Sequence, residues 1–123
     1  MSASLHHVHG VHVLLLPPEG PLLTSERDAA DWVGEALSAG VGLIAIPRIR
    51  LSPEFFRLSS GLAGAVLQKF TNYRLRVAIL GDVQPEMDAS APLRDFVTES
   101  NRGAQVWFLA DLAALKERLH AAG

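Results

Sequence analysis

LSPEFFRLSSGLAGAVLQKFTNY, residues 51–73, is the stretch that decides the fold. Ser52-Pro53-Glu54 predicts a helix start, because it combines a hydroxyl N-cap, a proline at the first helical position and a carboxylate in the first turn. Gly61 and Gly64 are expected to separate a short first turn from a main helix over residues 60–71. The apolar side chains of that helix recur at helical spacing and predict its buried face: Leu62, Val66, Leu67 and Phe70.

Two short apolar runs, residues 41–46 and 75–80, flank this stretch. The first run is almost wholly apolar and is closed by Pro47, which is typical of a parallel strand buried on both faces. Because the two runs enclose a helix, they predict a βαβ unit. The carboxyl ends of such strands are where open α/β sheets hold ligands or partners, so we expect Ser59 and Ser60 near that edge.

The rest of the chain completes an α/β fold. It predicts these elements in order: a hairpin (5–8 and 11–16), a helix from Thr24 or Ser25 ended by Gly40, a loop (83–91), a helix from Ser90 or Pro92 to Asn101, a strand (105–109) and a helix from Asp111 to His120. Asn72 is expected to end the central helix in the left-handed conformation. The predicted order is β-β-α-β-α-β-α-β-α, with a mixed, mostly parallel sheet of about five strands, an N-terminal hairpin and about four helices. We expect one domain over residues 1–123.

Composition excludes several function classes. The chain of 123 residues has no cysteine, so disulfides, thiolate chemistry and cysteine-based metal sites are excluded. Its net charge of −2 argues against a nucleic-acid partner, because nucleic-acid-binding domains usually carry a basic excess. No apolar run approaches the roughly 20 residues of a membrane-spanning helix, and the N-terminus lacks the pattern of a secretory signal. We therefore expect a cytoplasmic protein with no membrane partner and no nucleic-acid partner.

The histidines offer the one arrangement that resembles a metal site. A two-residue turn at His9-Gly10 would place His7 and His12 opposite each other on one face of the hairpin, with Cα atoms about 4.5 Å apart. That pair is close enough to share a metal ion, but His6 falls on the other face and no carboxylate is near in sequence. We therefore expect surface histidines, no metal and no cofactor.

The sequence contains no assembled catalytic motif. No G-x-S-x-G surrounds Ser59 or Ser60, and no histidine lies between His12 and His120 to act as a base. We therefore expect no catalytic residue and favour a non-enzymatic protein.

The helix start at residues 59–64 has two interpretations. Backbone N–H groups at a helix N-terminus favour an anion by about 0.3–1 kcal/mol, so this segment could bind a phosphate or carry one on a serine. It is not a Walker loop, because no G-K-[ST] follows. Alternatively, its small side chains let the helix pack close to the sheet.

Two further polar clusters, at residues 72–74 and 99–103, follow predicted helices. Each indicates a helix end with an arginine that compensates the helix dipole, and each could instead contact a ligand or a partner. Together with the helix start they make up the predicted ligand or partner surface: Ser59, Ser60, Gly61, Gln68, Lys69, Asn72, Tyr73, Asn101 and Arg102.

One pattern in the chain is specific enough to suggest a family. F-F-x-L-x-[ST]-G-x-A-G, L-Q-K-F-x-N-Y and A-I-x-G-D follow one another over residues 55–82, and E-S-N-x-G stands at residues 99–103. This series resembles a small bacterial family described only as a domain of unknown function. The resemblance covers nearly the whole chain and implies no activity.

A more distant resemblance is to STAS domains of the anti-sigma-factor-antagonist type. In those domains a buried strand leads to D-S-S-G-L-G at a helix start, and residues 58–63 here read L-S-S-G-L-A, with Leu58 in place of the aspartate. The resemblance implies a STAS-like α/β fold. It also implies Ser59 as a candidate for phosphorylation, because a partner kinase phosphorylates the first serine of that motif in STAS regulators.

These observations favour a regulatory or protein-interaction domain. It would act through a protein partner or through self-association, as a homodimer for example, at the helix over residues 59–73. The alternative is a small-ligand or anion-binding protein, with or without enzymatic activity, that uses Ser60-Gly61 with Arg102, Arg74 or Asn101. A third hypothesis, opposed by the net charge, is nucleic-acid binding through Arg48, Arg50, Arg74 and Arg76.

Overall fold

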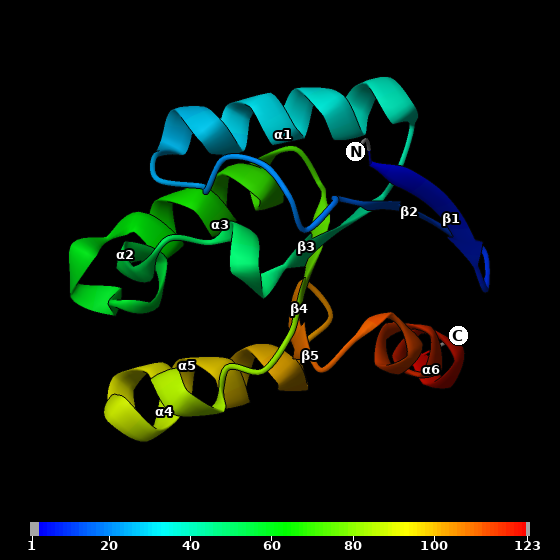
Figure 1. The fold of residues 1–123 in the computed structure, drawn as a ribbon. Coiled ribbons are helices and arrows are strands. Elements are labelled where there is room, and N and C mark those ends of the chain that lie inside the picture. Colours follow the sequence, from blue (N-terminus) through cyan, green and yellow to red (C-terminus); the bar gives the residue numbers. More distant parts are fainter. Residues whose placement is uncertain (1–2, 123) are drawn as a thin grey trace.

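The computed structural model describes residues 3–122, which form one mixed sheet with helices on both faces (Figure 1). Within these residues the sheet has five strands: β1 (Ser4–Val8), β2 (Val11–Leu15), β3 (Leu43–Pro47), β4 (Arg76–Leu80) and β5 (Val106–Leu109). Their spatial order equals their chain order. β1 is antiparallel to β2, and every later neighbour is parallel, so the expected mixed sheet with an N-terminal hairpin is confirmed.

The hairpin has the register that its turn dictates. His9 and Gly10 both have positive φ, 48° and 82°, as a two-residue type I′ turn requires. His7 is therefore paired with His12, as predicted from the sequence.

The described residues contain more helices than the four expected. They are α1 (Glu26–Ala39), α2 (Pro53–Phe56), α3 (Leu62–Asn72), α4 (Gln84–Ala89), α5 (Ala91–Arg102) and α6 (Leu112–Ala122), with the one-turn 3₁₀ helices η1 (Arg48–Arg50) and η2 (Leu58–Ser60). None of the helices in residues 3–122 has both the length and the apolar character needed to cross a membrane.

The prediction of a loop over residues 83–91 is wrong. Asp82 Oδ1 accepts a hydrogen bond from the Gln84 N–H at 2.9 Å, and Gln84 Nε2 donates to Asp88 Oδ1 at 2.7 Å across one turn. Pro85 stands in the first turn, where its missing N–H costs nothing. These local contacts produce the short helix α4.

The central helix begins and ends slightly later than predicted. Ser60 lies in η2, and Gly61, with φ of 81°, separates it from α3. The prediction of a left-handed Asn72 is wrong, because Asn72 is the last residue of α3 and its φ is not positive. Gln68 Nε2 donates to its side-chain oxygen at 2.8 Å. The positive φ instead occurs at Arg74, at 59°.

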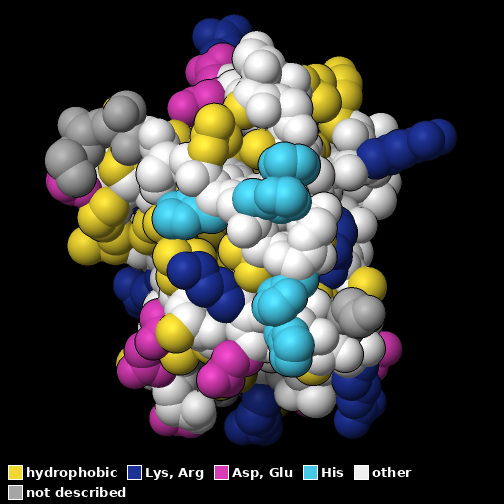
Figure 2. Space-filling view, turned by 90° about the vertical axis from the view of Figure 1, so that its right-hand side faces the viewer, with side chains coloured by type: hydrophobic (Ala, Val, Ile, Leu, Met, Phe, Trp, Pro, Cys, Tyr) yellow, Lys and Arg dark blue, Asp and Glu magenta, His cyan; other side chains and the backbone are white. Residues whose placement is uncertain are grey.

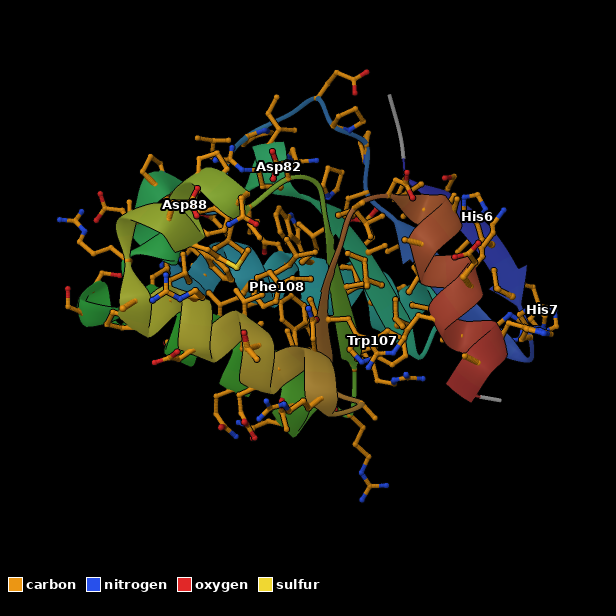
Figure 3. All side chains as sticks on the ribbon, turned by 90° about the horizontal axis from the view of Figure 1, so that it is seen from below. His6, His7, Asp82, Asp88, Trp107 and Phe108 are labelled. Atoms are coloured by element: carbon orange, nitrogen blue, oxygen red, sulfur yellow. The ribbon has the colours of Figure 1, made fainter. Side chains whose placement is uncertain are left out.

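Two apolar layers enclose the sheet. The larger contains side chains of α1, α3 and α5, such as Val33, Phe70 and Val97, against one face. The smaller is formed by Leu115 and Leu119 of α6 against the other face. Successive side chains of a strand contribute to opposite layers. In Figure 3, Trp107 points toward α6 while its neighbour Phe108 points toward α5. α6 thus lies alone across the sheet from the other helices (Figure 1).

Candidate functional site

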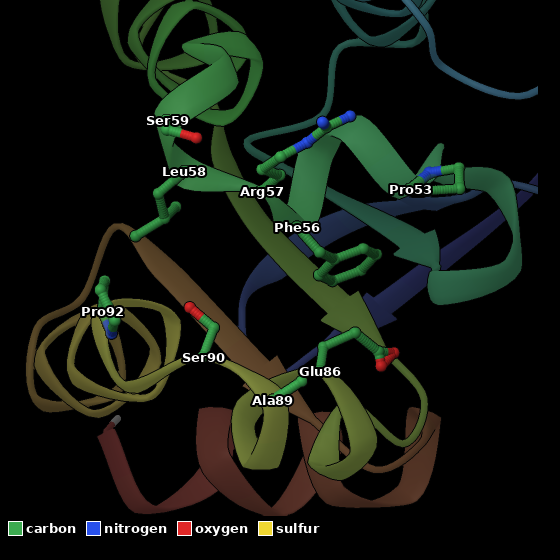
Figure 4. A pocket seen from close by; sticks show the side chains of 9 residues that line it. All are labelled: Pro53, Phe56, Arg57, Leu58, Ser59, Glu86, Ala89, Ser90 and Pro92. Atoms are coloured by element: carbon green, nitrogen blue, oxygen red, sulfur yellow. The ribbon is translucent and has the colours of Figure 1, made fainter.

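A pocket of about 330 Å³ lies at the carboxyl ends of β3 and β4, between two segments that diverge from the sheet (Figure 4). One wall is the segment from α2 to η2, and the other is formed by α4 and the start of α5. The pocket is lined by Phe56, Arg57, Ser59, Glu86, Ala89 and Pro92, among others. This is the edge at which the sequence predicted a site.

Gly81 allows these two walls to approach each other. Its φ is 141°, and a Cβ there would stand 2.8 Å from the Arg48 Cβ, closer than carbon atoms can pack. Only glycine therefore allows the chain after β4 to lie against η1, and α4 follows directly from there.

An ion pair between Arg48 and Glu86 joins η1 to the wall formed by α4. Arg48 Nε donates to Glu86 Oε1 at 2.9 Å, and Arg48 Nη2 donates to the same oxygen. The Glu86 side chain is only 15% exposed, and the Arg48 guanidinium lies 5.3 Å from the centre of the Phe56 ring. A second hollow of about 180 Å³ adjoins the pocket here and shares Phe56 and Glu86 with it. The pair thus fixes the geometry of the pocket's inner end.

Glu86 has one oxygen that the protein leaves unpaired. Its Oε2 is buried and has no hydrogen-bond partner among the described residues. Phe55 and Phe56 are both buried and belong to the core. The Glu86 oxygen is enclosed by protein, and the pocket lining itself is largely apolar, so the pocket suits a largely apolar group.

The two predicted serines have different environments. The Ser60 hydroxyl donates to the Glu54 carbonyl at 2.7 Å and accepts from the Leu62 N–H at 3.2 Å, so it is occupied in holding η2 against α3. Ser59 lines the pocket and is exposed. Of the predicted helix start, Ser59 is therefore the group available to a ligand or to a modifying enzyme.

Four other predicted residues lie together at a second place. Gln68, Lys69, Asn72 and Tyr73 line a hollow of about 370 Å³ beside the start of α1. Lys69 Nζ is 3.6 Å from Glu26 Oε1 across that hollow. Because α3 rises about 1.5 Å per residue from Leu62, Gln68 and Asn72 lie roughly 9 Å and 15 Å along the helix from its start beside Ser59. The predicted surface is therefore two separate places.

Asn101 and Arg102 lie at the end of α5, beside the outer strand β5, and neither lines the pocket. Asn101 Oδ1 accepts from the Phe108 N–H at 2.7 Å, and Asn101 Nδ2 donates to the Phe108 carbonyl at 3.2 Å. Arg102 is exposed and lies 3.5 Å from Glu99. The structure does not bring these two residues together with Ser59.

The sequence predicted the start of α5 but not α4, and the contribution of Glu86, Ala89 and Pro92 to the pocket was not foreseen. The sequence does contain a pattern that indicates α4. Gln84-Pro85-Glu86 has the proline and carboxylate of a helix first turn, as Ser52-Pro53-Glu54 does.

The histidines gather on the side of the molecule formed by the hairpin and the end of α6 (Figure 2). The His7 and His12 rings stack with centres 4.2 Å apart, and those of His9 and His120 lie 4.5 Å apart. Within residues 3–122, no group of three or more histidines, cysteines or carboxylates is placed to hold a metal ion.

The arginines of the nucleic-acid hypothesis do not form one surface. Arg50 is 7% exposed, with its guanidinium bonded to the carbonyls of Pro17 and Pro21. Arg48 is paired with Glu86. Arg76 lies over the Trp107 ring at 4.7 Å, and burial lowers its pKa. Three of the four basic groups therefore serve the fold.

Comparison with protein-family models matches residues 8–119 to one family, described as a domain of unknown function (DUF4180). This agrees with the resemblance to such a family seen in the sequence. The chain matches no curated protein and no solved structure.

Proposed function

We propose that this chain, which belongs to the DUF4180 family, is a non-enzymatic binding domain that holds a small, largely apolar ligand in the pocket beside Ser59. One observation carries the proposal: a preformed pocket lies at the carboxyl edge of a parallel sheet. Its volume of about 330 Å³ is within the range of small-molecule sites.

The chemistry of the pocket supports binding over catalysis. Ser59 would need a neighbouring base to act as a nucleophile. The five histidines of the chain belong to β1, β2, the turn between them and α6. Glu86 is already engaged with Arg48.

The test is a screen of small apolar alcohols, amines and acids by ¹H–¹⁵N NMR on the wild-type protein. Ligands should shift the amide signals of Ser59, Glu86 and Ala89. Ala89→Phe should fill the pocket, so the affinity derived from these shifts should fall at least tenfold. Ala113→Phe, on the exposed side of α6, is the matched control and should bind as wild type does. Equal binding by Ala89→Phe, or no shift at the pocket amides in the whole screen, would refute the proposal.

A second candidate is the STAS-like regulatory role, in which a protein partner binds α3 and a kinase modifies Ser59. Two observations favour it: the exposure of Ser59 beside the start of α3, and the half-exposed Tyr73 at its end, which is 52% exposed. A phosphate at Ser59 would be stabilised by the helix dipole of α3.

Phosphorylation by a purified anti-sigma-type kinase tests this second role. The kinase should label the wild type and Ser60→Ala but not Ser59→Ala, and Lys69→Glu should weaken the complex. Labelling that persists in Ser59→Ala, or no labelling of the wild type, would remove this candidate and leave the pocket proposal unaffected.

A further inference from the structure

The two edges of the sheet are treated differently by the protein. At β5 the Asn101 side chain bonds to both the N–H and the carbonyl of Phe108, in the manner of a neighbouring strand. At the other edge, no strand in residues 3–122 pairs with the outer side of β1. Sheet edges usually need such protection, because their free backbone groups are templates for another chain.

The register of the hairpin shows which backbone groups of β1 turn outward. The His12 carbonyl accepts from the Gly42 N–H at 3.1 Å, so His12 faces β3 and not β1. In an antiparallel pair, the residue opposite must then turn its own groups away from β2. His7 is opposite His12, and Leu5 is opposite Leu14 two residues on. His7 and Leu5 therefore present their N–H and carbonyl groups at the free edge.

β1 has none of the features that usually block an edge. Its sequence, SLHHV, contains no Lys, Arg, Glu, Asp or Pro, and its register with β2 has no bulge. Leu5 is 64% exposed. Figure 3 shows His6 and His7 at this outer border of the molecule, away from α5.

We propose that two copies of this chain associate through their β1 strands, antiparallel about a two-fold axis at His6. In this register Leu5 lies opposite His7 of the second copy, and His7 opposite its Leu5. Each of these two pairs exchanges both backbone hydrogen bonds, since both members face outward. Ser4 to Val8 is then paired along its whole length, and the two sheets become one.

This register is self-complementary in donors, acceptors and charge. The His6 residues of the two molecules lie opposite each other as a non-hydrogen-bonded pair, with Cα atoms about 4.5 Å apart. Ser4 lies opposite Val8 of the second copy, so it is about 13 Å from its own counterpart along the strand. None of the side chains paired across the strands is a lysine, an arginine or a carboxylate. The surface is separate from the pocket and from α3.

Oligomeric state in solution and cysteine cross-linking test the proposal together. The wild type should sediment as a dimer, and His7→Pro should be monomeric at the same concentration, because proline removes an N–H that faces outward. His7→Ala keeps that N–H and should remain dimeric. Should His7→Pro fail to fold, Leu5→Lys provides the second test, as a charge at the edge that also gives a monomer.

The cross-linking arm reports the register. Since the chain has no cysteine, a single introduced thiol can form a disulfide only with the same thiol of a second molecule. His6→Cys should form a disulfide-linked dimer on mild oxidation, because its Cα separation lies within the range that disulfides span. Ser4→Cys, on the same face of the same strand, is the matched control and should stay monomeric on a denaturing gel.

Three results would overturn the inference: a wild type that is monomeric at every concentration, a dimer that survives both His7→Pro and Leu5→Lys, or equal cross-linking of Ser4→Cys and His6→Cys.

Discussion

The closure of the β5 edge by Asn101 leads to a quantitative prediction. Asn101→Ala removes the acceptor of the Phe108 N–H and the donor to its carbonyl. Phe108 is 7% exposed, so both groups lose their partners in a largely buried position. Each unpaired buried group costs about 1–3 kcal/mol, and water at the new gap lowers the sum, so we expect a loss of about 2–4 kcal/mol.

Urea unfolding followed by tryptophan fluorescence measures this loss, because Trp107 stands next to Phe108 and is buried. The midpoint should fall without a change in slope. Arg102→Ala is the matched control, since it alters an exposed side chain one position along the same helix. Its free energy of unfolding should stay within about 0.5 kcal/mol of the wild type. The reasoning is refuted if Asn101→Ala is no less stable than Arg102→Ala.

Two further predictions concern glycine geometry and acid stability. Gly81→Ala places a Cβ 2.8 Å from the Arg48 Cβ at a φ of 141°, and should lower the free energy of unfolding by roughly 2–4 kcal/mol. Gly34→Ala, inside α1 with open space around it, should instead raise thermal stability, and equal effects would contradict the steric account. Asp28 accepts hydrogen bonds from the Thr24 N–H and hydroxyl, which lower its pKa below 3.8. Its stabilisation is therefore complete above that value and is lost as pH falls through the lowered pKa. Urea unfolding over a pH series should show wild type and Asp28→Asn converging in acid, and a constant difference would count against this linkage.

Much of the fold follows from local patterns. The His9-Gly10 turn sets the hairpin register, and with it the pairing of His7 and His12, because a two-residue turn leaves one alignment. Ser25 and Ser90 cap their helices as expected, since a side-chain oxygen needs only an N–H a few residues away. The parallel strands were recognisable as short apolar runs between helices.

The candidate site could be predicted only in part. Ser59 was expected at the carboxyl edge of the sheet, and it lines the pocket there. Its opposite wall was missed, since residues 83–91 were assigned to a loop. The separation of Ser59 from Gln68 and Tyr73 follows from the length of α3, which continues as one helix between them.

By itself, the sequence determined the chain order of the strands, the hairpin register and the caps at Ser25 and Ser90. The register and the two caps depend on residues within a few positions of one another, whereas the cap predicted at Ser52 makes no side-chain hydrogen bond. Only the tertiary structure decided that Glu86 meets Arg48, 38 residues earlier in the chain. It likewise decided that Ser60 is occupied and Ser59 is not. The physical reason is that packing of helices on the sheet sets distances between remote segments, and no local pattern of residues encodes those distances.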